Sequence, residues 1–64
     1  MLPKDSYILL SYVNTKLRDF FSDLTSFCED EGISCDELIE RLRAIGYDYQ
    51  EQNNQFQKMK HLIM

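Results

Sequence analysis

The hydrophobic residues near the start of the chain recur at the spacing of an amphipathic helix. The predicted apolar stripe consists of Leu10, Val13, Leu17 and Phe20 or Phe21, with Leu9 beside it. The opposite stripe consists of Tyr7, Ser11, Asn14 and Arg18. We therefore predict a helix over about 5–19, with Asp5 or Ser6 as the N-cap that accepts hydrogen bonds from the first free amides.

Residues that typically end a helix and residues that typically begin one then follow one another closely, and they predict two short helices. Ser22 is the expected N-cap of a helix at 23–31, which buries Leu24, Phe27 and Cys28. Gly32 suits the left-handed position after a helix, and Ser34 with Glu37 has the spacing of a capping box. A third helix is expected at 35–45, ended by Gly46. Its inner face consists of Leu38, Ile39, Leu42 and Ile45.

After Gly46 the pattern alternates every second residue, which indicates strands. Tyr47 and Tyr49 alternate with polar residues, and Phe56 lies between two glutamines. A four-residue turn at 51–54 completes a predicted hairpin at 47–57. For the tail, 58–64, fraying, extension of the hairpin and packing on another copy stay open. The predicted fold is mainly α: three helices with a helix-turn-helix core and a small C-terminal β-hairpin, winged-helix-like.

Size and charge narrow the classes of function. A chain of 64 residues makes one domain, 1–64, of marginal stability unless it dimerises. The formal net charge of −4 argues against non-specific affinity for nucleic acid or anionic membrane. The longest hydrophobic run, Ile8 to Leu10, is far short of the roughly 20 residues of a membrane span. Without a signal-peptide layout, the expected compartment is the cytoplasm, where Cys28 and Cys35 stay reduced.

Four segments are similar to a known bacterial family. They are Leu2 to Asp5 followed by Leu9 to Asp19, Ile45 to Tyr49, and Asn54 to Phe56. Over roughly residues 2–57 the chain resembles the family named domain of unknown function 4250. The resemblance implies a short stand-alone bacterial protein and brings no activity, ligand or catalytic residue with it.

The residue types give little support for catalysis or for metal binding. The single histidine, His61, lies near the C-terminus, and a general base needs a fixed partner in a closed pocket. Two cysteines with six residues between them, without a second Cys or His pair, do not make a zinc site. We expect no enzyme activity, no metal and no cofactor. Cys35, at the start of a helix, is kept as a candidate redox residue, although Asp36 and Glu37 disfavour its thiolate.

A protein partner is the leading expectation, and the chain itself is one candidate, as a homodimer. The candidate partner-binding residues are Tyr7, Ser11, Asn14, Arg18, Tyr47 and Tyr49. The alternative for two of them is a structural role inside the protein. Arg18 would pair with an acid and Asn14 would cap backbone groups of the hairpin, so that both hold the first helix to Tyr47 and Tyr49.

DNA binding is the other candidate function, as a helix-turn-helix regulator. Its expected contacts are Lys16, Arg18, Arg41 and Arg43. The helix that would enter the groove begins with Asp36 and Glu37, and acids near phosphates lower affinity. Between Asp19 and Glu40 there are eight acids and no base. This excess of acidic residues therefore disfavours binding to nucleic acid.

Overall fold

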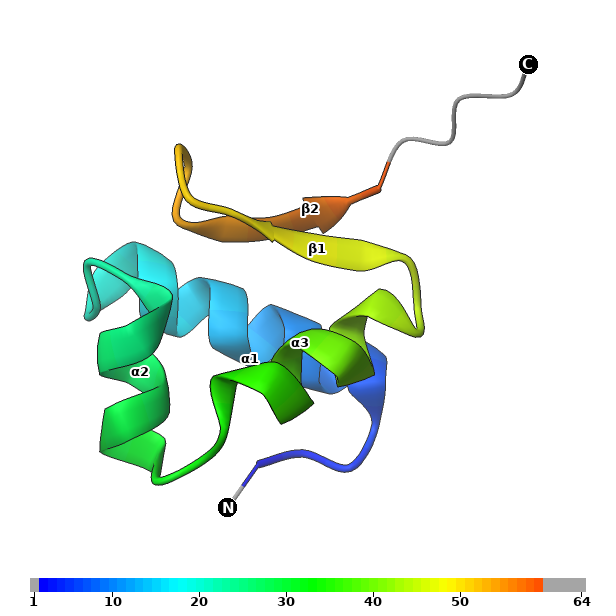
Figure 1. The fold of residues 1–64 in the computed structure, drawn as a ribbon, viewed down its shortest axis with the longest axis horizontal. Helices are drawn as coiled ribbons and strands as arrows, with labels where there is room; N and C mark the ends of the chain where they lie inside the picture. Colours follow the sequence, from blue (N-terminus) through cyan, green and yellow to red (C-terminus); the bar gives the residue numbers. More distant parts are fainter. Residues whose placement is uncertain (1, 60–64) are drawn as a thin grey trace.

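A computed structural model describes residues 2–59 of the chain. Three helices come first, followed by a hairpin (Figure 1). The elements are α1 (Ser6–Asp19), α2 (Leu24–Glu31), α3 (Cys35–Arg43), β1 (Tyr47–Gln50) and β2 (Gln55–Lys58). The fold of the described residues is thus mixed and mostly helical, as predicted at this level. Within them, no helix is both long and apolar enough to cross a bilayer.

Side-chain caps explain where the helices begin. Asp5 accepts hydrogen bonds from the amides of Tyr7 and Ile8 at 2.8 and 3.1 Å, which confirms it as the N-cap of α1. The N-cap of α2 is Asp23 rather than Ser22, because the Asp23 carboxylate accepts from the Ser26 amide at 2.8 Å. This bond lowers the pKa of Asp23. The prediction of Ser22 was therefore wrong by one residue.

The turn between α2 and α3 is built as its residues predict. Gly32 has φ +71, and the Ile33 amide donates to the Cys28 carbonyl at 3.0 Å. This bond ends α2, and Gly32 takes the left-handed backbone conformation there, which glycine adopts without steric cost. Ser34 then caps α3 by accepting from the Glu37 amide. The third helix ends at Arg43, two residues earlier than predicted, and residues 44–46 form a turn.

The hairpin has its turn at residues 51–54, as predicted. Tyr49 lies opposite Phe56, and Gln50 lies opposite Gln55. Asn54 closes the turn with φ +53, a conformation that asparagine tolerates better than most residues. The strands extend to Lys58, and the Met59 amide donates to the Gly46 carbonyl at 2.8 Å. The hairpin is therefore slightly longer than the predicted 47–57, and the rest of the expected tail, 60–64, lies outside the described residues.

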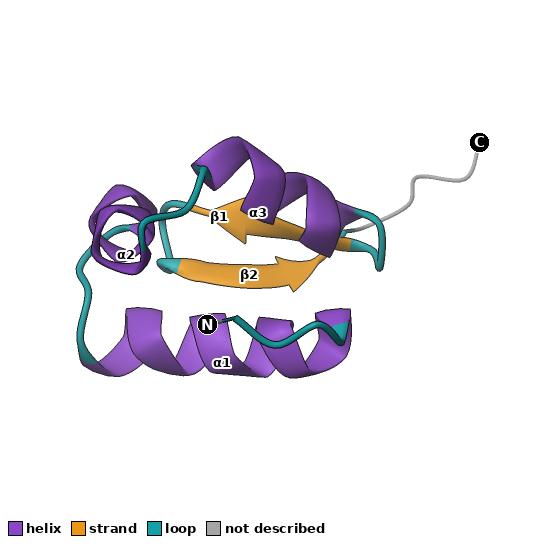
Figure 2. Ribbon diagram, turned by 90° about the horizontal axis from the view of Figure 1, so that it is seen from below, coloured by secondary structure: helices purple, strands orange, loops and turns teal. Residues whose placement is uncertain are grey.

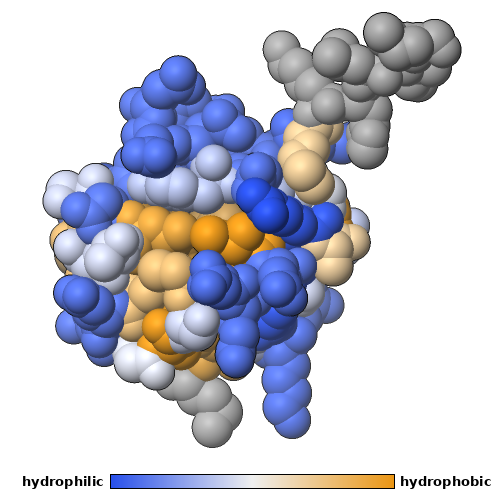
Figure 3. All heavy atoms as spheres, in the orientation of Figure 1, coloured by the Kyte–Doolittle hydropathy of each residue, from blue (hydrophilic) through white to orange (hydrophobic). Residues whose placement is uncertain are grey.

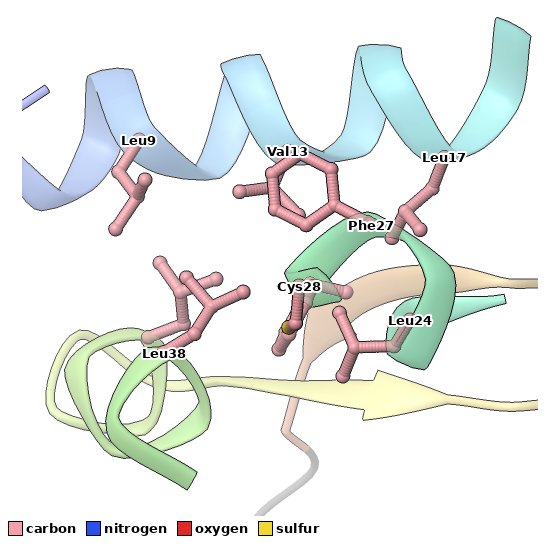
Figure 4. Close-up of a cluster of buried hydrophobic side chains, with 9 residues drawn as sticks. Leu9, Val13, Leu17, Leu24, Phe27, Cys28 and Leu38 are labelled. Atoms are coloured by element: carbon pink, nitrogen blue, oxygen red, sulfur yellow. The ribbon is translucent and has the colours of Figure 1, made fainter. Parts of the chain in front are cut away.

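One apolar core joins all three helices to β2. Leu9, Val13 and Leu17 of α1 face α2 and α3 in Figure 4. Their partners in the core are Leu24, Phe27, Cys28, Leu38, Leu42 and Phe56. The Phe27 ring meets Phe21 and Tyr12 edge to face, with centroids 5.6 and 6.2 Å apart.

Two positions of the predicted apolar stripe differ from the structure. Leu9, rather than Leu10, is fully buried, while Leu10 is half-buried and packs against the rim of the core. Phe20 is 70% exposed, because α1 ends at Asp19 and the chain turns before Phe20 can follow the helical stripe. Phe21 packs inward in its place.

The hairpin lies across α1 and α3, which flank it in Figure 2. β2 lies nearer α1, and β1 nearer α3. In Figure 3 an apolar band appears between the polar hairpin and the helices below it, where the core approaches the surface. On the side of α1 turned away from α3, no described element covers the helix (Figure 2). This arrangement divides α1 into a face that holds the fold and a face that is left open.

Candidate functional site

On the face of α1 next to the hairpin, an asparagine side chain makes the two backbone hydrogen bonds that a neighbouring strand would make. The Asn14 side chain accepts from the Phe56 amide at 2.7 Å and donates to the Phe56 carbonyl at 3.0 Å. A strand residue directs both backbone groups toward one side, so Asn14 occupies the edge of β2 turned away from β1. The expected structural role of Asn14 is confirmed by these two bonds.

A second asparagine fastens the turn of the hairpin to the end of α1. Asn54 donates to the carbonyls of Leu17 and Phe21 at 3.0 and 2.8 Å, and its oxygen accepts from the Tyr49 hydroxyl at 2.7 Å. Gln55 adds a bond to the Asn14 carbonyl at 2.9 Å. We call these residues, Asn14, Asn54 and Gln55, the amide clasp. They bind the hairpin to α1 through backbone groups of both elements.

The two candidate tyrosines of β1 belong to the same region. Both Tyr47 and Tyr49 are half-buried and pack against the core. The Tyr49 ring meets the Phe56 ring with centroids 5.5 Å apart, and burial raises the pKa of its hydroxyl. Little of Tyr49 is therefore available to a partner.

The opposite side of α1 has a different character. Its residues, which we call the outer face, are Tyr7, Ile8, Ser11, Thr15 and Arg18. All five are exposed, and Tyr7 and Ile8 retain 62% and 60% of their accessible surface. Tyr7, Ser11, Thr15 and Arg18 also line an open groove of about 290 Å³, whose other lining residues are Leu10 and the clasp residues Asn14 and Gln55. The sequence interpretation selected Tyr7, Ser11 and Arg18 and missed Ile8 and Thr15.

Arg18 is the charged end of this face. Its guanidinium forms a two-bond ion pair with Asp19, at 2.8 and 3.0 Å, and its side chain is still 69% exposed. The hydrogen bond from Arg18 lowers the pKa of Asp19. The expected pairing of Arg18 with an acid is confirmed, but the pair lies in solvent rather than inside the protein. Exposed pairs of this kind stabilise a fold very little.

The other candidate DNA contacts are engaged with neighbouring groups. Arg41 donates to the carbonyls of Pro3 and Lys4 at 3.1 and 2.8 Å and so holds the N-terminal segment. Arg43 pairs with Asp48 at 3.0 Å, which lowers the pKa of that carboxyl. The Lys16 ammonium lies 4.9 Å from the centroid of the Phe20 ring. Of the four candidate DNA contacts, Lys16 and Arg18 lie on α1, whereas Arg41 and Arg43 lie on α3.

The cysteines lie together between α2 and α3. Burial, a hydrogen bond with the Cys35 thiol and the proximity of that thiol raise the pKa of Cys28 to about 12. Cys35 is half-buried, and its thiol lies 3.9 Å from the Leu24 carbonyl. Cys28 is therefore a protonated core residue. Among residues 2–59, no three His, Cys, Asp or Glu side chains form a group that could hold a metal ion.

These observations define a small helical domain whose hairpin is held by side-chain amides. Residues 3–56 match the family described as Domain of unknown function (DUF4250), and the chain belongs to that family. The match covers all residues of the amide clasp and of the outer face. No curated protein and no solved structure matches the chain.

Sequence reasoning had no means of assigning Asn54 and Gln55 to the clasp. Asn54 was recognisable as a turn residue by its tolerance of positive φ, but its contacts with Leu17 and Phe21 depend on how the hairpin folds back. The same holds for Tyr12, whose hydroxyl donates to Glu31 at 2.7 Å across α1 and α2. This bond raises the pKa of Tyr12.

Proposed function

We propose that this protein is a non-enzymatic protein-interaction module that binds its partner through the outer face of α1. The observation that carries the proposal is the exposure of Tyr7 and Ile8, at 62% and 60%, beside the groove along the helix. Tyrosine and arginine, which lie at the two ends of this face, are residue types enriched among those that dominate binding energy at interfaces. We also propose a cytoplasmic location, which fits the two unbridged cysteines.

The amide clasp supports this assignment because it separates folding from binding. On the hairpin side of α1, Asn14 bonds the backbone of Phe56, while Asn54 and Gln55 donate to the carbonyls of Leu17 and Asn14. The outer face makes no such contact with another element. Its side chains form only the local Arg18–Asp19 pair among the hydrogen bonds of residues 2–59. A partner can therefore cover the outer face without disturbing the fold.

The alternative proposal, a DNA-associated regulator, rests on the finer description of the fold as winged-helix-like, with α2 and α3 as a helix-turn-helix. It has weaker support from side chains. Arg41 and Arg43 are bonded to Lys4 and Asp48, and α3 begins with exposed Asp36 and Glu37. Salt-sensitive binding of duplex DNA that is lost in Arg43→Glu would favour this alternative.

A pull-down with matched variants tests the interaction proposal. Tagged wild-type protein, Ser11→Arg and Gln52→Arg are incubated with nuclease-treated host lysate. Ser11 is central on the outer face, whereas Gln52 is exposed in the hairpin turn, so the two variants add the same charge at different places. We expect one protein to be retained by wild type and Gln52→Arg and lost with Ser11→Arg. Equal retention by all three would contradict the proposal.

A further inference from the structure

We infer that the outer face of α1 binds a second copy of this chain, with the two α1 helices packed antiparallel about a twofold axis. This inference rests on the proposed function, because it names the partner of the same surface. Its basis is the order in which different side chains follow one another along the exposed side of α1.

The outer face is complementary to the same face of a second copy when the two helices run antiparallel. Its N-terminal end is apolar, with Tyr7 and Ile8, and its C-terminal end carries the Arg18–Asp19 pair. Two small hydroxyl residues, Ser11 and Thr15, lie between these ends. The midpoint of the face falls near position 13, so an antiparallel copy brings Ser11 opposite Thr15 of the other copy.

This alignment also matches the two ends. Tyr7 and Ile8 of one copy meet Arg18 and Asp19 of the other. A tyrosine ring against a guanidinium is a favourable contact, and the long aliphatic stem of arginine packs against apolar side chains. Each interface contains the contact twice, because a twofold axis repeats every pair.

The centre of the face permits close approach. Ser11 and Thr15 are one helical turn apart and small, and both are exposed. Helices pack at about 8–10 Å between axes, and the shorter distances need small residues at the crossing. Neither residue makes a side-chain hydrogen bond with another described residue, so both hydroxyls are available across the axis.

Charge favours a second copy at this place. The chain carries a net charge of −4, so two copies repel one another overall. On the outer face, however, Arg18 is balanced by Asp19, and the other four residues are uncharged. This neutral strip is where two acidic copies approach without a cost in repulsion.

The size of the helix sets the expected strength. A helix of 14 residues is about 21 Å long, so the contact is smaller than the roughly 1,200–2,000 Å² of a stable interface. We therefore expect a weak dimer with a dissociation constant on the order of 100 μM.

Sedimentation velocity over a concentration series tests the inference. Wild type should shift from monomer to dimer as its concentration rises to about 1 mM. Ser11→Arg places two like charges near the axis and should weaken the dimer by at least about a hundredfold. Tyr7→Ala should weaken it by about tenfold. Gln52→Arg should dimerise like wild type.

Two results would overturn the inference. One is a wild type that stays monomeric throughout the series, and the other is a dimer that Ser11→Arg leaves intact. Neither result decides the proposed function, because a different protein bound at the outer face would still be lost from the pull-down with Ser11→Arg.

Discussion

The two sides of α1 use similar residue types for opposite purposes. On the hairpin side, Asn14 exchanges two hydrogen bonds with the backbone of Phe56 at 2.7 and 3.0 Å. On the outer face, Ser11 and Thr15 are polar and exposed without such contacts. Asn14 and Thr15 are neighbours in the chain, yet the helical turn sends one to the hairpin and the other to solvent. A polar helix residue therefore becomes structural when unpaired backbone lies within its reach.

The clasp and the apolar core also stabilise the fold by different means. The core gains from removing Leu9, Val13 and Phe27 from water, which needs no particular direction of approach. The clasp depends on direction, because an amide satisfies both groups of Phe56 only in one register. A hairpin of two strands is marginal by itself in water. The clasp thus fixes the position of an element that apolar packing alone leaves poorly specified.

Among substitutions that distinguish the two faces of α1, Asn14→Ala is expected to cause the largest loss of stability. The substitution leaves the amide and carbonyl of buried Phe56 without partners, and each unsatisfied buried group costs about 1–3 kcal/mol. We expect a loss of about 2–4 kcal/mol in the free energy of unfolding, measured by urea denaturation. Thr15→Ala is the matched control and should lose far less. Equal losses in the two variants would break the distinction between the faces.

A smaller loss of folding stability is expected at alkaline pH, and its origin is Cys28 in the core. The pKa of Cys28 rises from 9.0 in the ordinary thiol to about 12 in the folded chain. The unfolded thiol therefore releases its proton at lower pH than the folded one, so stability is retained below pH 9 and falls as pH rises toward about 12.

Thermal melts from pH 8 to about 11 check this sign, with wild type compared with Cys28→Ala. The variant should begin less stable, because it leaves a small cavity, and its melting temperature should fall less steeply with pH. The remaining decline is expected from Tyr12 and Tyr49, whose pKa values are also raised. Parallel curves for the two proteins would show that Cys28 does not contribute to the alkaline loss.

The smallest effect is expected for Arg18→Ala on the outer face. The Arg18–Asp19 pair is exposed to solvent, and exposed pairs contribute little to folding. At concentrations well below those of self-association, the melting temperature should change by no more than about 3 °C. A drop comparable to that of Asn14→Ala would mean that Arg18 belongs to the structural side of the helix.

Local signals in the sequence predicted the elements well, because each depends on a few neighbouring residues. Asp5, Gly32 and Ser34 act within one helical turn, and they have the predicted roles. Choosing Ser22 over Asp23 failed because both are good caps, and only the path of the chain decides between them. The choice between Phe20 and Phe21 stayed open for a similar reason, and Phe21 is the one that packs against the core because the helical stripe ends where the helix does.

The candidate site was only partly predictable, because its residues depend on contacts distant in the sequence. Asn14 and Phe56 are separated by 42 positions, and helical spacing gives no information about such a pair. Tyr7, Ser11 and Arg18 were selected as one stripe, and they do share a face. Spacing alone left open whether Asn14, in the same stripe, binds a partner or holds the hairpin, since that depends on the placement of the hairpin.

The central claim is that α1 folds the protein with one face and leaves the other free to bind. Hydrogen exchange of the Phe56 amide in wild type, Asn14→Ala and Ser11→Arg tests this most directly, because that amide donates to Asn14. At low protein concentration, exchange should be at least about tenfold faster in Asn14→Ala and unchanged in Ser11→Arg. Faster exchange in Ser11→Arg, or no change in Asn14→Ala, would contradict the division of the helix into two faces.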